Sequence, residues 1–199
     1  MPADDKYTYP GSSGVLRNLL DITDAEALDV ATNAYVSIEW AALLREVIPD
    51  ELDFTYLQFV HRRLFGKVFP WAGEVRDVEL RAAGTSYAYC PSRLVQARLD
   101  EAFDALAAAE YLRGMDALEF AHALAQTWAE LTRIHPFRDG NTRSQSFFVS
   151  RLAELAGHPI DWDQVNVDNL RAQRLAAAKG HPEALGFFVE HHLIDPPTF

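Results

Sequence analysis

The feature that most constrains the fold is a polar stretch of twelve residues, His135 to Ser146, which lies between two alanine-rich apolar segments. The first apolar segment runs over residues 120–131, and the second runs over residues 147–156. A polar loop that joins two helices of a protein core is a common way to hold reactive groups on a rigid frame. The sequence therefore predicts two buried helices that carry a phosphate- or nucleotide-binding loop between them.

Helix boundary signals predict further helices on both sides of this pair. One helix is expected to begin at the capping-box pattern Thr23 to Glu26, and a second at Asp53, with Gly66 as its stop. The buried stripe of the first helix is expected to repeat every three or four residues, at Leu28, Ala31, Tyr35, Ile38 and Ala42. Further helices are expected over about residues 92–112, 116–133, 141–156, 168–179 and 182–193.

Residues 67–91 break this helical pattern. Apolar and polar residues alternate over residues 75–80 and again over 87–89, with a turn at 82–84, which predicts a short β-hairpin. An isolated two-stranded hairpin is only marginally stable in water, so this one is expected to lean on the helices or on a partner, as a movable flap does. The expected fold is an all-α helical bundle with one inserted β-hairpin, the flap, at about residues 74–90.

Length, charge and cysteine content limit the possible functions. A chain of 199 residues fits one domain, with residues 1–20 as an N-terminal arm and residues 21–199 as the domain. The net charge of −11 is a poor match for nucleic acid or an anionic membrane surface. No apolar stretch approaches the ~20 residues that a membrane span needs. The single cysteine, Cys90, excludes an internal disulfide, which makes the cytoplasm the expected location, although secretion stays compatible with it.

The residue types in the polar stretch suit phosphate chemistry. His135 can accept a proton from an attacking hydroxyl, because histidine titrates near neutral pH. Asp139 offers a hard oxygen ligand for Mg²⁺, and Arg143 can place a guanidinium on phosphate oxygens. Gly140 allows close backbone approach, and a helix that begins at about Asn141 would present free N–H groups to an anion. Residues of these types also occur at ordinary helix junctions, so their composition alone leaves both interpretations open.

The stretch also resembles the signature of Fic proteins, which reads His-x-Phe-x-Asp/Glu-Gly-Asn-Gly-Arg-x-x-Arg. Six of its eight specified positions match, namely His135, Phe137, Asp139, Gly140, Asn141 and Arg143. Three other parts of the chain are similar to family segments: residues 61–66 followed by 71–76 before the hairpin, 84–91 in the flap, and 157–162 after the signature helix. The resemblance covers about residues 20–195.

This resemblance implies a Fic domain that transfers AMP from ATP to a hydroxyl side chain of a target protein. His135 would deprotonate the hydroxyl, whose oxygen would attack the α-phosphate while pyrophosphate leaves. Asp139 would hold Mg²⁺. The phosphates would be bound by Gly140, Asn141, Thr142 and Arg143. The flap would hold the target segment by adding a strand to it, with contacts from Thr85, Ser86 and Tyr87.

Two positions depart from the Fic pattern. Thr142 stands in place of the second glycine, and Ser146 stands in place of the last arginine. These departures leave open a catalytically weakened binding module, or a transferase that uses another nucleotide or diphosphate donor. Residues 150–154 do not match the family's inhibitory pattern, Ser/Thr-x-x-x-Glu-Gly/Asn, because Leu155 follows Glu154. That fits either a toxin-like chain controlled by a separate small antitoxin or a chain without such control.

Overall fold

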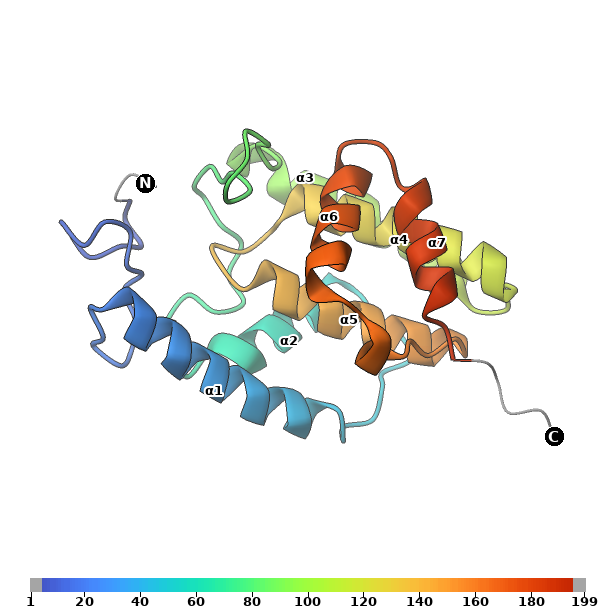
Figure 1. Cartoon of the computed structure of the whole chain (residues 1–199), viewed down its shortest axis with the longest axis horizontal. Coiled ribbons are helices and arrows are strands. Elements are labelled where there is room, and N and C mark those ends of the chain that lie inside the picture. The colour runs from blue at the N-terminus through green and yellow to red at the C-terminus, as the bar shows by residue number, and fades with distance from the viewer. Residues whose placement is uncertain (1–4, 195–199) are drawn as a thin grey trace. The chain divides into compact units, whose positions relative to one another are not determined.

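The computed structural model describes residues 5–194, and these residues are predominantly helical (Figure 1). The chain forms two compact units, one made of Met1–Val47 and Gln58–Glu74, the other of Ile48–Leu57 and Val75–Phe199. The α-helices are α1 (Ala25–Leu43), α2 (Phe54–Phe65), α3 (Val95–Ala108), α4 (Ala117–Ile134), α5 (Asn141–Ala156), α6 (Val167–Ala178) and α7 (Glu183–His191). Three short 3₁₀ turns complete them, η1 (Ser92–Leu94), η2 (Glu110–Leu112) and η3 (Trp162–Gln164). The expected all-α class is thereby confirmed.

Helix α1, in the first unit, differs in detail from the prediction. Asp24 caps it by accepting from the N–H of Ala27, so the expected cap at Thr23 is one residue too early. The expected stripe is also wrong, since Ile38 is 63% exposed. The buried residues are Leu28, Thr32, Val36, Glu39 and Leu43.

The reason for this shifted face is a buried carboxylate. Glu39 lies 2.7 Å from Nζ of Lys67 and 3.2 Å from a guanidinium nitrogen of Arg63. The hydrogen bond from Lys67 lowers the pKa of Glu39, so the carboxylate remains charged while facing inwards. A prediction from apolar periodicity alone places a glutamate on the exposed face of a helix, and it therefore selects the wrong buried face for α1.

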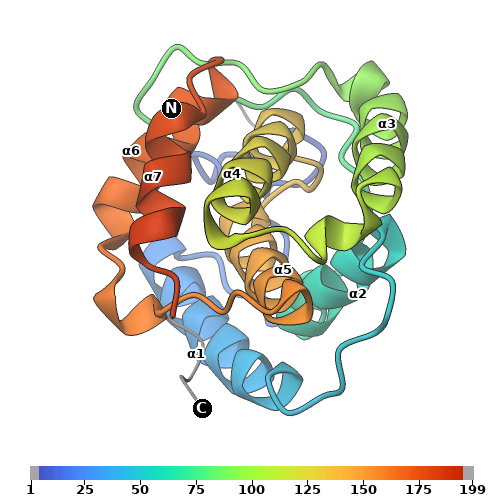
Figure 2. The same cartoon turned by 90° about the vertical axis from the view of Figure 1, so that its right-hand side faces the viewer.

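Helix α4 is the central helix of the second unit, where it contacts α3, α5, α6 and α7 (Figure 2). Its N-terminus is fixed by a capping box between Asp116 and Glu119. The alanines of α4 allow neighbouring helices to approach on several sides, and its larger apolar residues fill the core. The buried apolar residues of α4 are Phe120, Ala121, Leu124, Ala125, Trp128, Ala129, Leu131 and Ile134.

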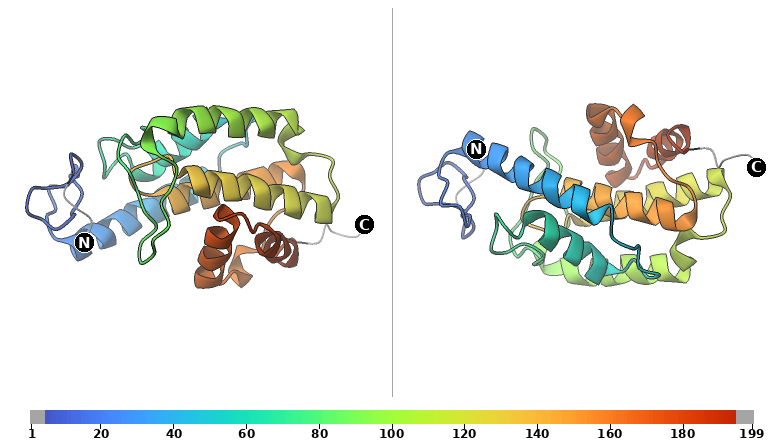
Figure 3. Two further views of the ribbon diagram at one scale, coloured as in Figure 1. Left: turned by 90° about the horizontal axis from the view of Figure 1, so that it is seen from above. Right: turned by 90° about the horizontal axis from the view of Figure 1, so that it is seen from below.

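Glycines with left-handed backbone bound α5, the helix after the polar stretch. Gly140 precedes it with φ 75°, and Gly157 ends it with φ 86°. Only glycine adopts such angles without steric cost, so these two positions place both ends of α5. The predicted arrangement of two buried helices with a short loop between them is confirmed (Figure 3).

Residues 75–90, called the flap segment below, contain no strand in the part of the chain that the structure describes. They form an isolated antiparallel bridge between Arg81 and Ala88, so the expected β-hairpin is not confirmed. The segment leans on the end of α6, since the Tyr87 hydroxyl donates to the carbonyl of Ala178 over 3.0 Å. Nη2 of Arg171 in α6 likewise donates to the carbonyl of Ala83 over 3.0 Å.

None of the helices in the described part of the chain is both long and apolar enough to cross a membrane.

Replacing Phe137 tests how the loop is held to the core. Its side chain is completely buried in the second unit's core, so Phe137→Ala should destabilise the fold by about 3–5 kcal/mol. Phe187 is 61% exposed and serves as the matched control, for which Phe187→Ala should cost about 1 kcal/mol or less. Urea unfolding measures both, and equal losses would contradict the role given to Phe137.

Candidate functional site

His135 lies where α4 ends and the polar loop begins. Its backbone is left-handed, with φ 50° and ψ 65°, and its N–H donates to the carbonyl of Leu131 over 3.0 Å. A non-glycine residue rarely adopts this conformation, so the surrounding structure must hold it in place. The strained turn directs the chain into Pro136 and the buried Phe137 and gives His135 a fixed position.

Asn141 braces the loop from the start of α5. Its side-chain oxygen accepts from the N–H of Phe137 over 2.8 Å, and its side-chain nitrogen donates to the carbonyl of Phe137 over 2.7 Å. The amide is therefore used within the protein, and Asn141 can offer a ligand only its backbone. No hydrogen bond among the described residues uses the backbone N–H of Asn141 or Thr142. These two donors, at the positive end of the helix dipole, suit an anion.

Thr142 has an exposed side chain in the first turn of α5, and its backbone is helical. A β-branched residue is compatible with that backbone, whereas it would strain a left-handed one. The glycine of the Fic pattern is therefore not needed for backbone geometry at this position.

Asp139 and Arg143 face solvent beside this helix end. Their side chains are 46% and 30% exposed, and Nη2 of Arg143 lies 3.8 Å from Oδ2 of Asp139. Within the described part of the chain, no three His, Cys, Asp or Glu residues cluster as a metal site. Mg²⁺ often binds through one or two carboxylates together with nucleotide phosphates, so the exposed Asp139 carboxylate fits that role.

Arg76 is a residue of the site that the sequence did not reveal. Its buried guanidinium donates to four carbonyls: Nε to His135 over 2.7 Å, Nη1 to Val78 over 2.6 Å, and Nη2 to Cys90 over 2.5 Å and to Ile134 over 3.1 Å. Its backbone N–H also donates to Pro136. Arg76 thus joins the flap segment to the loop that carries His135. The sequence contains no local signal for these contacts, because His135, for example, lies 59 positions away.

Tyr89 covers the imidazole of His135. The two rings stack with centroids 3.7 Å apart and an interplanar angle of 6°. Tyr87 packs edge-on against Tyr89 at 5.6 Å. The alternation of residues 87–89 placed both tyrosines on one face of the segment, but the prediction singled out Tyr87 and missed Tyr89.

Thr85 and Ser86, the other two predicted flap contacts, are exposed and shape the turn. The Thr85 hydroxyl donates to the carbonyl of Ala82 over 3.0 Å and accepts from the N–H of Tyr87. The carbonyl of Ser86 accepts from Arg81 over 3.2 Å. Their positions support a turn, while a contact with a target stays a prediction.

His135 is neutral at physiological pH. Burial lowers its pKa to about 3, and the positive charges of Arg174 and Arg76 lower it as well. The backbone of Thr132 has the opposite effect and raises the pKa. Its Nδ1 atom is buried and has no hydrogen-bond partner among the described residues. A neutral imidazole can accept a proton, which suits the role of a base.

A small cavity of about 40 Å³ opens beside His135. Its lining brings together residues from the flap segment, α4, α5 and α6, namely Ala82, Tyr89, Thr132, His135, Thr142, Arg171, Arg174 and Leu175. The cavity therefore adjoins both the candidate base and the N-terminus of α5. Arg171 and Arg174 give it positive charge that the sequence analysis did not assign.

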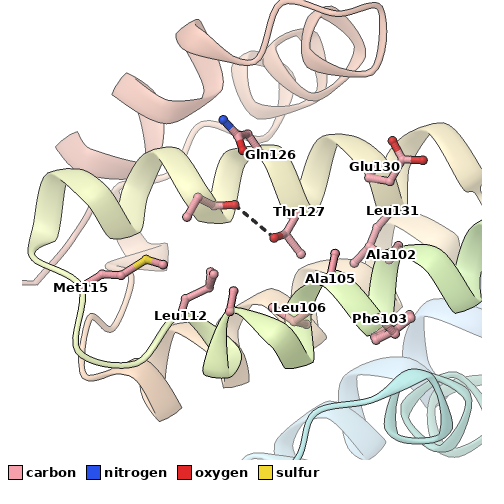
Figure 4. A pocket seen from close by; sticks show the side chains of 12 residues that line it. Ala102, Phe103, Ala105, Leu106, Leu112, Met115, Gln126, Thr127, Glu130 and Leu131 are labelled. Carbon is pink, nitrogen blue, oxygen red and sulfur yellow. Dashed lines mark hydrogen bonds between the residues drawn. The ribbon is translucent and has the colours of Figure 1, made fainter.

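Two larger cavities lie along α3 and α4. One, of about 400 Å³, is lined mainly by alanines and other apolar residues, and the hydroxyl of Thr127 in its lining donates to the carbonyl of Ala123 (Figure 4). The other, of about 590 Å³, includes Tyr89 and Ile134 from the surroundings of His135. Neither has a residue of the polar loop in its lining.

Comparison with known proteins gives the same family throughout. The Fic/DOC family model matches residues 51–153. The probable protein adenylyltransferase y4lH of Sinorhizobium fredii is 34% identical over 161 residues, which are 79% of this chain and 80% of that protein. Protein adenylyltransferase VbhT of Bartonella schoenbuchensis is 31% identical over 97% of this chain, which spans only 40% of VbhT. The crystal structure of BepC from Bartonella tribocorum with bound AMPPNP superposes with a TM-score of 0.88 at 26% identity, covering 96% of this chain and 97% of that one.

Acidification tests the environment of His135. The pKa of a histidine in the unfolded chain is about 6.5, whereas the pKa of His135 in the folded chain is about 3. Between these values the unfolded state binds more protons, so the fold should lose stability as the pH falls. Between about pH 7 and about pH 5 the wild type should lose about 1–2 kcal/mol more than His135→Gln in urea unfolding. Equal losses would mean that the imidazole is not desolvated.

Proposed function

This chain belongs to the Fic/DOC family, and on that premise we propose that it is a protein adenylyltransferase that transfers AMP from ATP to a hydroxyl side chain of a target protein. The relatives VbhT and y4lH bear the names protein adenylyltransferase and probable protein adenylyltransferase, and the related BepC domain binds AMPPNP. The observation that carries the proposal is the junction of α4 and α5. It places a neutral imidazole, the start of a helix with two unpaired N–H groups, and an arginine within nine residues.

His135 acts as the general base in this proposal. It takes the proton of the target hydroxyl, whose oxygen forms a bond to the α-phosphorus of ATP. The bond between that phosphorus and the bridging oxygen breaks, and pyrophosphate leaves with the electron pair. A base with a pKa of about 3 is weak, but bound phosphates bring negative charge that opposes Arg174 and Arg76. Nucleotide binding thus raises the pKa of His135 by offsetting the part of the shift that the two arginines cause.

The phosphates bind at the start of α5. The backbone N–H groups of Asn141 and Thr142 donate to phosphate oxygens, and Gly140 permits their close approach. Arg143, in the first turn of α5, places its guanidinium on phosphate oxygens. Asp139 would hold Mg²⁺, which neutralises phosphate charge when bound.

The flap segment binds the target. A target strand adds to the backbone of a hairpin formed by residues 74–90, with Thr85, Ser86 and Tyr87 as side-chain contacts, and this mode tolerates varied target sequences. A separate small antitoxin is the proposed regulator, in keeping with the missing inhibitory pattern. The proposed domain spans residues 21–199 after an arm of residues 1–20, and its proposed place of action is the cytoplasm of a cell.

Transfer of labelled phosphate tests this function. The wild type, Mg²⁺ and a cell lysate as the source of targets are incubated with ATP labelled in either the α- or the γ-phosphate. The expected result is protein-bound label from the α-phosphate only, lowered by at least about 100-fold in His135→Ala. His181→Ala, a change of an exposed histidine elsewhere in the chain, is the matched control and should transfer normally.

The other outcomes separate the alternatives. Label from the γ-phosphate indicates a phosphotransferase. Transfer from another nucleotide alone indicates that Thr142 and Ser146 have changed the donor. If no nucleotide gives transfer, and the wild type equals His135→Ala, the chain is a binding module that retains the Fic fold.

A further inference from the structure

We propose that Arg174 of α6 is a nucleotide-binding residue, whose guanidinium contacts a phosphate group of the nucleotide in the cavity beside His135. This inference rests on the proposed function, because it assigns a further contact to the same nucleotide. It is carried by the surroundings of Arg174 and not by the signature stretch, from which Arg174 is separated by a whole helix.

Arg174 is a buried cation without a counterion. It is 4% exposed, and its Nη2 donates only to neutral oxygens, Oε1 of Gln145 over 2.5 Å and Oγ1 of Thr132 over 3.1 Å. Its Nε is buried and unpartnered. Among the described residues, no carboxylate lies within ion-pair distance of Arg174. Arg151 in α5 is equally buried, but it has a carboxylate partner, Glu154, at 2.7 Å.

A cation in this position is costly to the protein by itself. Removing a charge from water without an opposite charge destabilises the fold, and burial lowers the pKa of Arg174 to about 10. An arginine has no other protonation state to adopt near neutral pH, so it remains charged. Arg76 is equally buried, but four carbonyls accept from its guanidinium, whereas Nε of Arg174 has no acceptor among the described residues. A bound anion would supply Arg174 with both the missing acceptor and a counterion.

The position of Arg174 specifies a phosphate of the nucleotide. It lines the same cavity as His135 and as Thr142, which is in the first turn of α5. The guanidinium is fixed by Gln145, which also donates to the carbonyl of Leu131, and by the Trp128 ring at 5.1 Å. A fixed, planar guanidinium beside free backbone N–H groups is a set of donors that matches phosphate oxygens.

The test compares phosphate-bearing and phosphate-free ligands. Dissociation constants of ATP with Mg²⁺, AMP and adenosine are measured by NMR titration for the wild type, Arg174→Gln, Arg174→Lys and the control Arg151→Gln. Arg174→Gln should raise the dissociation constants of ATP and AMP by about 10- to 100-fold, because a charge-assisted hydrogen bond is lost. The dissociation constant of adenosine should stay within about twofold of the wild-type value. Arg174→Lys retains the charge and should recover part of the affinity. Arg151→Gln should lower the melting temperature and leave all three affinities unchanged.

Several results would overturn the inference. If Arg174→Gln weakens the binding of adenosine and of ATP equally, Arg174 contacts the nucleoside. If a folded Arg174→Gln variant binds ATP as tightly as the wild type, the role of Arg174 is purely structural. If Arg174→Gln does not fold, Arg174→Lys decides, since wild-type-like affinities for ATP and AMP in a folded lysine variant would show that the guanidinium is not required. A wild type that binds ATP through Arg174 without transferring AMP would refute the proposed function alone. AMP transfer with an ATP affinity independent of residue 174 would refute the inference alone.

Discussion

The buried guanidinium of Arg76 is the interaction on which the candidate site depends. Its hydrogen bonds reach carbonyls at both ends of the flap segment, Val78 and Cys90, and at the end of α4, Ile134 and His135. Two parts of the chain that have no regular pairing with each other are thereby held together. Hydrogen bonds to a charged group contribute about 1.5–3 kcal/mol each, so this single side chain can fix a loop that contains no strand.

The environment of His135 follows from that junction. The flap segment is also tied to α4 by the N–H of Cys90, which donates to the carbonyl of Arg133, so Tyr89 is held flat on the imidazole. The stacked ring excludes water, and water loss is the main cause of the low pKa of His135. The same contact covers one face of the imidazole, and the cavity of about 40 Å³ lies beside His135. One element of the fold, the flap segment, thus both covers a face of the imidazole and helps to keep it neutral.

Local sequence signals predicted most helices, because capping residues and left-handed glycines act on their own neighbours. Asp53, Asp116, Gly140 and Gly157 all mark the ends that the structure has. The polar loop could be predicted for the same reason, since its signature lies within twelve positions. The buried face of α1 could not be predicted, because Glu39 lies on it and pairs with residues 24 and 28 positions away in the sequence. Arg76, Tyr89 and Arg174 were missed as members of the site for the same physical reason, as each acts through contacts distant in sequence.

Native-state hydrogen exchange in the variant Arg76→Lys tests the central claim most directly. Lysine retains the charge but cannot donate to four carbonyls in a fixed plane. The account predicts that backbone amides of residues 78–90 and of residues 134–140 lose protection together, while those of the middle of α4 keep theirs. Loss of protection in only one of the two segments, or in neither, would contradict the conclusion that Arg76 joins the flap segment to the loop that carries His135.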